Sequence, residues 1–192
     1  MKKAIFGLVM IFICTILFAQ QQPVAAYSIG DTGPAGGIIF YDKGVFADGW
    51  RYLEAAPEST EFRTEWGADG QNVAGTDMSV GSGRRNTQLI VEHLNSTGES
   101  NGAAQICAAM DINGFTDWFL PSKDELNLMH INLGQKGLGG FKTVNDRTIW
   151  THIYWSSSQF STSIAWHQNF NSGTQDIDNK VNVSSVRAVR VF

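Results

Sequence analysis

The stretch that organises the chain is Asn113–Leu133, NGFTDWFLPSKDELNLMHINL. It opens on the turn dipeptide Asn113-Gly114. The run Asp117–Leu120 follows, and its aromatic and aliphatic side chains are expected to be buried. Pro121 ends this run, because proline lacks the amide hydrogen that a continuing strand would need. A buried aromatic segment therefore leads directly into the next element.

That next element is predicted to be a helix over Lys123–Leu133. Ser122 and Glu125 have the spacing of a capping box, in which the serine hydroxyl accepts from the Glu125 amide and the carboxylate accepts from the Ser122 amide. Gly134 is a suitable residue to end the helix. The buried face is expected at positions i, i+3, i+4 and i+7, which are Leu126, Met129, His130 and Leu133.

Upstream of this stretch, two strands and two helices are predicted. Ile38–Tyr41 and Trp50–Ala55 are expected to pair as a hairpin. Pro57–Gly83 is interpreted as a long polar loop, and a loop of this length inside a domain is usually functional or flexible. Apolar residues at helical spacing then predict helices over Asn86–Leu94 and Ala103–Met110.

Downstream, a second long loop covers Gly134–Ile153, and only strands are predicted after it. These strands are Tyr154–Ser158, Ile164–Phe170, Thr174–Asp178 and Ser185–Phe192. Because the helices are central and the strands lie at both ends, we expect the α+β class with an antiparallel sheet, two to three helices and long loops. The first and last strands are expected to be neighbours, which brings the two ends of the domain together.

The first 26 residues, Met1–Ala26, are interpreted as a secretory signal peptide. Lys2 and Lys3 form a basic start, and Ala4–Ala19 is almost wholly apolar but short for a membrane span. The alternative is an uncleaved anchor. We expect an exported protein, located in the periplasm, at the cell surface or in the medium, with a single domain over residues 27–192 and no membrane span in the mature chain.

The net charge of the mature chain argues against two classes of partner, and its cysteine content excludes an internal disulfide. Removal of Lys2 and Lys3 lowers the basic residues from 14 to 12 against 18 acidic residues, so the mature net charge is −6. Such a domain is not a general binder of nucleic acid or anionic membranes. The mature part keeps only Cys107, so no disulfide can form within it, and its stability must come from packing.

Four segments carry a family resemblance. They are DWFLPSKDEL at Asp117–Leu126, YWSSS at Tyr154–Ser158, AWHQNF at Ala165–Phe170 and VRAVR at Val186–Arg190. In this order they resemble the Lcl C-terminal domain family, which is named from a collagen-like bacterial adhesin and is grouped with C-type-lectin-like folds. The resemblance covers most of Tyr27–Phe192. It implies a C-type-lectin-like fold and says little about activity.

The residues argue against an enzyme. Cys107 is the one nucleophile that stands out, but it shares an apolar helical face with Ile106 and Met110, where a free cysteine usually acts as a small core residue. Formylglycine-generating enzymes, distant relatives of this fold class, use reactive cysteines in a paired arrangement that the chain lacks. We therefore expect no enzymatic activity, with an enzyme related to that group as the alternative.

No cofactor is expected, and a metal site is left open. The four histidines form no short metal-binding motif, although His152 and His167 could meet across adjacent strands. Asp176, Asp178 and Asn179 suggest calcium, but Val181 and Arg187 stand where an EF-hand needs glycine and glutamate. The tripeptides that hold calcium and sugar in C-type lectins are also missing. Calcium in the long loops remains an open alternative.

The candidate ligand-binding residues lie on or beside the two long loops. Sugar sites combine a flat apolar face with hydrogen-bonding groups, and tryptophans near polar residues supply that combination. Trp155 and Trp166 are expected to be core residues of the sheet. The candidate residues are Trp66, Arg84, Arg85, Trp150 and His152, with the two arginines as ion partners for a sulfated sugar.

Together these observations predict an exported, non-enzymatic binding module. Its expected ligand is a glycan or a surface protein at the cell envelope or cell surface, and nucleic acid is not an expected partner. A structural envelope module with no small ligand is the third alternative, beside the enzyme. Because a fold does not determine a function, the binding role rests on the family resemblance.

Overall fold

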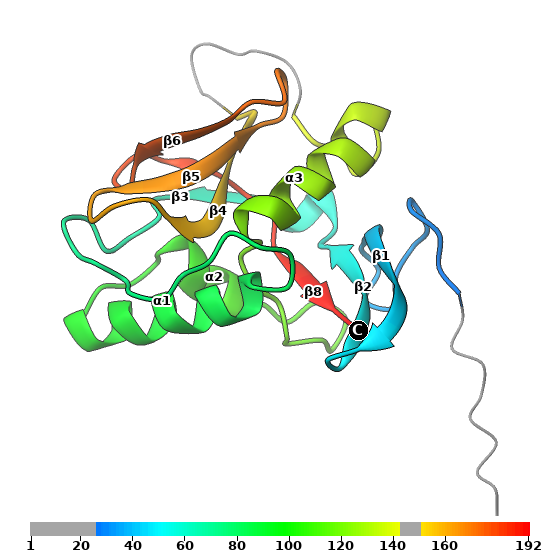
Figure 1. The fold of residues 1–192 in the computed structure, drawn as a ribbon, viewed down its shortest axis with the longest axis horizontal. Helices are drawn as coiled ribbons and strands as arrows, with labels where there is room; N and C mark the ends of the chain where they lie inside the picture. Colours follow the sequence, from blue (N-terminus) through cyan, green and yellow to red (C-terminus); the bar gives the residue numbers. More distant parts are fainter. Residues whose placement is uncertain (1–25, 143–150) are drawn as a thin grey trace, which may run out of the picture.

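The computed structural model describes residues 26–142 and 151–192, and Figure 1 shows their arrangement. The strands are β1 (Ile38–Ala47), β2 (Trp50–Ala55), β3 (Phe62–Thr64), β4 (Ile153–Gln159), β5 (Ile164–Asn169), β6 (Gln175–Asn179), β7 (Ser184–Val186) and β8 (Val189–Val191). The helices are α1 (Gly83–Thr97), α2 (Ala103–Ala108) and α3 (Lys123–Asn132), with short 3₁₀ turns at Glu58–Thr60 and Gly134–Lys136. This is the α+β class, as predicted, whereas the C-type-lectin-like assignment stays a prediction.

The described strands form two sheets where an antiparallel sheet was predicted. One sheet has the order β1-β2-β8 and the other β3-β7-β4-β5-β6. The second sheet is mixed, because β4 and β7 run parallel. Figure 1 shows the two sheets toward opposite ends of the molecule, and α3 contacts strands of both.

The last predicted strand, Ser185–Phe192, is broken into β7 and β8, which belong to different sheets. The break falls at Arg187 and Ala188. The Arg187 side chain has no exposed surface; its guanidinium donates to the carbonyls of Ala56 and Gly139 and pairs with Glu61 at 2.6 Å. This buried arginine sits where the chain crosses from one sheet to the other.

The hairpin and the meeting of the domain ends are confirmed, with one difference. β1 and β2 pair antiparallel as predicted, but β8 pairs with β2 and not with the first strand. The ends still meet, because the Tyr27 ring lies 5.4 Å from the Phe192 ring. In the part of the chain that the structure describes, every helix is too short or too polar to cross a bilayer.

The central stretch behaves as predicted. Trp118, Phe119 and Leu120 are buried, and backbone hydrogen bonds of 2.8 and 2.9 Å tie Phe119 to Val189 at the start of β8. The capping box is present, with the Ser122 amide donating to the Glu125 carboxylate at 2.7 Å and the Glu125 amide donating to the Ser122 hydroxyl at 3.2 Å.

The other helices differ from prediction at their ends. α1 begins at Gly83, three residues before Asn86, and α2 ends at Ala108 before Met110. Position 83 requires glycine, because a Cβ there would overlap the Glu125 carboxylate. Phe62–Thr64, inside the predicted long loop, forms strand β3 against β7.

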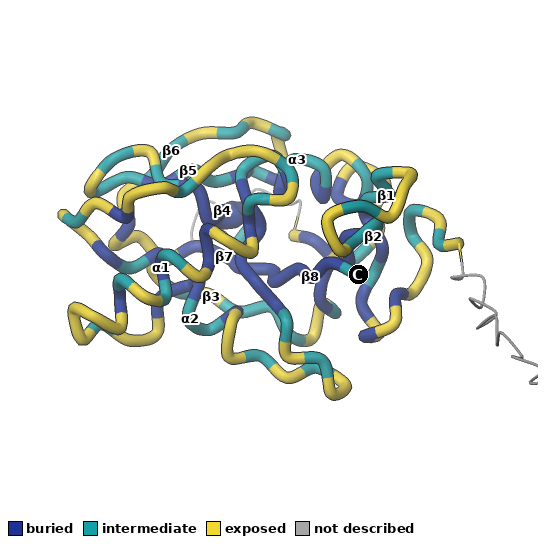
Figure 2. Tube along the Cα trace, turned by 60° about the horizontal axis from the view of Figure 1, so that its bottom comes forward, coloured by how far each residue is buried: buried dark blue, intermediate teal, exposed yellow. Residues whose placement is uncertain are grey.

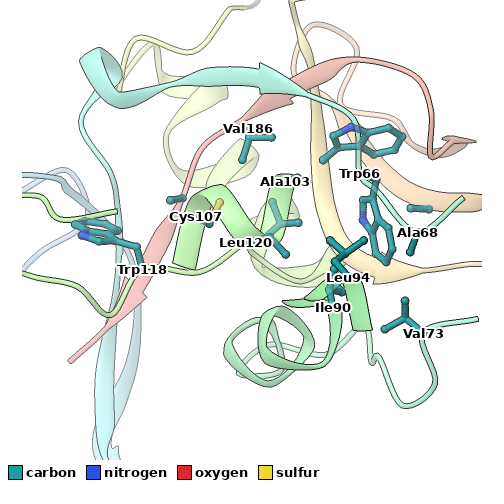
Figure 3. Packing of buried hydrophobic residues seen from close by; sticks show 14 of the residues in the cluster. Trp66, Ala68, Val73, Ile90, Leu94, Ala103, Cys107, Trp118, Leu120 and Val186 are labelled. Atoms are coloured by element: carbon teal, nitrogen blue, oxygen red, sulfur yellow. The ribbon is translucent and has the colours of Figure 1, made fainter. Parts of the chain in front are cut away.

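The buried apolar residues form two clusters. One contains Trp66, Ile90, Leu94, Trp118 and Trp155 under α1 and α2, and Figure 3 shows part of it. The other lies around α3 and the β1–β2–β8 sheet. Figure 2 shows that β4, β7 and β8 run through the buried middle of the molecule.

Candidate functional site

Trp66 does not lie on the surface, so the prediction that its ring stacks on a ligand is wrong. Its side chain has no exposed area, and its indole nitrogen donates to the Ser156 carbonyl at 2.8 Å. Figure 3 shows the ring near Leu94 and Ala68. A ring enclosed in this way has no face to offer a sugar.

A buried lysine covers one face of the Trp66 ring. The Lys180 ammonium lies 4.6 Å from the ring centroid and has no exposed surface. Four oxygens lie within hydrogen-bond distance of its nitrogen, at 2.7–3.1 Å, and share its three N–H donors. They are the carbonyls of Ala68, Gln71 and Thr162 and the side-chain oxygen of Gln159. Burial lowers the pKa of Lys180 to about 8, against the opposing effect of the nearby acidic groups. These contacts hold Ala68 and Gln71 of the long loop against Lys180.

The two predicted histidine partners are not brought together. His152 is 1% exposed, so it is also unsuited to contact a ligand at the surface. In the β4–β5 register His167 is opposite Trp155, while the Phe170 amide donates to the His152 carbonyl. The residues that the structure describes contain no group of three or more His, Cys, Asp or Glu able to hold a metal ion. Trp150 lies outside the described residues.

Arg84 and Arg85 are exposed, as predicted, but they lie on the first turn of α1 and not on a loop. Arg84 borders a groove of about 350 Å³ next to Trp118 and Phe119. Its guanidinium lies 3.5 Å from the Asp117 carboxylate, which also binds Arg190. The charge of Arg84 is therefore partly balanced, which weakens the case for a sulfated ligand there.

Cys107 is a core residue, as expected. Its side chain is fully buried in the cluster with Trp66, and burial raises the pKa of its thiol far above the ordinary value. A thiol in this environment stays protonated and is not reactive as a nucleophile. The geometry gives no support to the alternative of an enzyme that uses this cysteine.

The structure shows a different candidate site, a cleft of about 630 Å³ beside the outer strands of the larger sheet. We call it the β5–β6 cleft. The residues that line it are Ile153, His167, Asn169, Asp176, Ile177, Asp178, Asn182, Val183 and Ser184. Its volume lies in the range of ordinary small-ligand sites. The lining combines polar groups, namely carboxylates, amides, a hydroxyl and an imidazole, with aliphatic side chains.

Strand pairing places the polar groups of the β5–β6 cleft. His167 is directly opposite Asp176, and Ala165 is opposite Asp178, so both carboxylates share one face of the sheet with the imidazole. Asp178 accepts a hydrogen bond of 2.7 Å from the Asn182 side chain, which holds the following loop against the strand. The sequence and pairing together thus bring two carboxylates, an imidazole and an amide to one place.

Burial lowers the pKa of His167, although Asp178 and Asp176 act in the opposite direction. The ring is therefore neutral at pH 7. Its Nδ1 atom is buried and makes no hydrogen bond within the described residues. A neutral imidazole beside two carboxylates can accept or donate hydrogen bonds but adds no positive charge.

Comparison with known proteins places the chain in a family. The family model for the Lcl C-terminal domain matches residues 59–190. The chain belongs to the Lcl C-terminal domain family. This family membership confirms the resemblance carried by the DWFLPSKDEL segment and the three segments after it.

Other comparisons of this Lcl C-terminal domain protein add little. Among solved structures it is similar to a fimbrial protein from Bacteroides ovatus ATCC 8483, with 13% identity and a TM-score of 0.49. The match covers 74% of this chain and 36% of that one, so the chain spans little more than a third of that protein's length. The comparison with curated proteins gave no match.

Sequence reasoning missed the β5–β6 cleft of this family member, although part of the signal was present. Asp176 and Asp178 were noticed as possible calcium ligands, and their alternation along a strand already places them on one face. What the sequence does not show is that His167 stands opposite Asp176, or that Asn182 folds back onto Asp178. Those relations depend on the register between two strands.

Proposed function

We propose that this protein is an exported, non-enzymatic binding module of the cell envelope or cell surface, and that it binds a glycan in the β5–β6 cleft. Membership of the Lcl C-terminal domain family fits a binding or structural module at the surface. Export is proposed from the basic and apolar character of residues 1–26. The buried, protonated Cys107 supports a non-enzymatic role.

The observation that carries the proposal is the composition of the β5–β6 cleft. Sugars present many hydroxyls on a partly apolar ring, and a matching site needs carboxylate or amide partners beside aliphatic surface. The hydrogen-bonding groups come from the carboxylates of Asp176 and Asp178 and the amide of Asn182. The aliphatic side chains are those of Ile153 and Val183. The polar groups stand on paired strands and on a loop fixed by the Asp178–Asn182 hydrogen bond, which keeps them in position.

The test is a glycan array probed with the protein purified after export from cells that express the full chain. A glycan hit is expected, and Asn182→Ala should weaken its binding while the melting curve is retained. Arg84→Ala and Arg85→Ala serve as matched surface controls at the start of α1, outside the cleft, and should leave binding unchanged. Loss of binding in the arginine variants alone would move the site to α1.

Two alternatives give distinct results in the same experiment. A protein ligand would leave the array empty and would be captured from a surface extract in a way that Asn182→Ala reduces. A purely structural module would bind neither glycan nor protein through this cleft. An empty array would overturn the proposal of a glycan ligand, and binding that is insensitive to cleft variants would overturn the β5–β6 cleft as its site.

A further inference from the structure

We propose that the ligand of the β5–β6 cleft carries a positive charge, and specifically that it is a glycan with free amino groups. This inference rests on the proposed function and names the class of glycan that the same site prefers. It is carried by the charge balance of the cleft, by the hydrogen-bonding atoms left available on its carboxylates, and by the apolar surface beside them.

The charge balance of the cleft is one-sided. Asp176 and Asp178 line it, and no lysine or arginine does so among the residues that the structure describes. His167 is neutral at pH 7, because burial lowers its pKa. The Arg63 guanidinium lies at the border of the cleft, where it donates to the Val183 carbonyl at 2.9 Å. An acidic or sulfated sugar would therefore meet two negative charges among the lining residues, while an ammonium group would meet favourable partners.

The carboxylates also have free capacity for hydrogen bonds. The Asp176 Oδ1 atom accepts from the Ile177 amide at 2.8 Å, and the Asp178 Oδ1 atom accepts from the Asn179 amide and the Asn182 side chain at 2.8 and 2.7 Å. The Oδ2 atom of each carboxylate makes no hydrogen bond within the described residues. An ammonium group has three donors and no acceptor, so it matches these acceptor atoms.

The position of the two carboxylates suits one bound ammonium group. They are two residues apart on β6 and point to the same side of the sheet, with His167 opposite Asp176 on the neighbouring strand. The Nδ1 atom of His167 is buried and makes no hydrogen bond within the described part of the chain. Asp176 is exposed and Asp178 is half-buried, so both carboxylates can be reached by a ligand from solvent, and salt should screen their attraction for an ammonium group.

The remainder of the cleft fits a sugar ring better than a lysine side chain. A volume of about 630 Å³ is larger than a single extended side chain needs and lies within the range of small-ligand sites. Val183, which is 46% exposed, offers aliphatic surface to the ring carbons beside the buried Ile153. Asn169 and Asn182 offer amides to the ring hydroxyls. We therefore favour an amino sugar over a basic peptide as the occupant.

The experiment compares two probes that differ only in the amino group. Calorimetric titrations of the exported full-length product use glucosamine oligosaccharides with free amines and the same oligosaccharides after N-acetylation. The free-amine form should bind at least about tenfold more tightly at low salt, as expected for one additional charge pair. This preference should shrink as ionic strength rises, because salt screens the attraction.

Variants link that preference to the two carboxylates. Asp176→Asn and Asp178→Asn keep the side-chain shape and should reduce the affinity for the free-amine form about tenfold, with little effect on the N-acetylated form. Asp48→Asn is the control, because its carboxylate is 90% exposed at the tip of the β1–β2 hairpin. Melting curves that match the wild type show that the variants are folded.

The outcomes separate the two proposals. Equal or tighter binding of the N-acetylated form, or unchanged affinity in both aspartate variants, overturns the amino-sugar inference while glycan binding in the cleft still stands. A second result would also overturn only the amino-sugar inference: neither oligosaccharide binds, but the array yields another glycan whose binding depends on Asn182. Glycan binding in the cleft would then still stand. Tighter binding of a basic peptide than of the free-amine sugar also overturns it. An array without any glycan ligand removes both proposals.

Discussion

The Lys180 ammonium lies 4.6 Å from the centroid of the Trp66 ring, and neither side chain has any exposed surface. This cation–π pair joins the segment before β7 to the long loop that begins after β2. Four oxygens around Lys180 satisfy the ammonium, so a charge is kept in the interior with hydrogen-bond partners. The pair explains why a tryptophan on a predicted loop is a core residue.

Trp66→Ala is expected to destabilise the fold by about 3–5 kcal/mol, because it removes a large buried side chain and uncovers Lys180. Urea unfolding monitored by circular dichroism measures this loss. Lys180→Met, which keeps most of the apolar stem, should also destabilise, since several buried oxygens lose their donor. A Trp66→Ala variant with wild-type stability and reduced ligand affinity would show that the ring is a binding residue after all.

The capping box of α3 leads to a second prediction. Ser122→Ala should cost about 0.5–2 kcal/mol, as other N-cap replacements do. We expect the upper part of this range, because the Ser122 hydroxyl also donates to the Ser79 carbonyl at 2.9 Å and so holds the loop before α1. Thermal denaturation of Ser122→Ala beside Ser122→Thr separates the hydroxyl from the side-chain size. Equal loss in both variants would argue against the cap.

Gly83 gives a third prediction about close packing. Gly83→Ala should be strongly destabilising, because the added Cβ would overlap the buried Glu125 carboxylate. The comparator is Gly98→Ala at the end of α1, where nothing lies near the added carbon but φ is +77°. Gly98→Ala should cost about 1 kcal/mol from backbone strain alone. Chemical denaturation of both variants should rank Gly83→Ala as clearly less stable.

Local signals made part of this fold predictable. The capping box, the end of the apolar run at Pro121 and the bounds of β2 all depend on residues close together in the chain. The α+β class followed from the order of such elements. Signals of this kind depend only on a few adjacent residues, so they can be recognised in a single sequence.

Relations between distant segments account for what the sequence did not show. Burial of Trp66 depends on Lys180, and the break between β7 and β8 depends on the partners that Arg187 finds on other segments. The β5–β6 cleft exists because the strand register sets His167 opposite Asp176. The candidates named from loop position failed for the same reason, since a predicted loop says nothing about which of its side chains turn inward.

Export gives a prediction that depends on the sequence alone, because residues 1–25 lie outside the described part of the structure. The basic Lys2-Lys3 start and the short apolar run predict cleavage by a signal peptidase. Intact-mass analysis of the exported product should show a first residue between Gln20 and Tyr27. A product that retains Met1 would mean that the segment is an uncleaved anchor.

The last prediction concerns pH and the buried Glu125 carboxyl. Glu125 has no exposed surface, and burial raises its pKa to about 7, although amide hydrogen bonds from Ser122, Gly81 and Gly83 act in the opposite direction. The unfolded chain loses this proton near the ordinary value of 4.5, while the folded protein keeps it until about pH 7. Between these values the folded state binds more protons than the unfolded state.

Stability contributed by this group is therefore fully present below about pH 4.5 and is lost as pH rises through about 7. For one proton the slope approaches about 1.4 kcal/mol per pH unit within that window. Other groups titrate there too, so the measured quantity is the unfolding free energy of wild type minus that of Glu125→Gln. Urea titrations between about pH 3.5 and about pH 8 extend roughly one unit beyond each end of the window. This difference should decline toward pH 7 and then level off. A difference that rises with pH would show that Glu125 is ionised in the folded protein and held by the amides of the α1 and α3 caps.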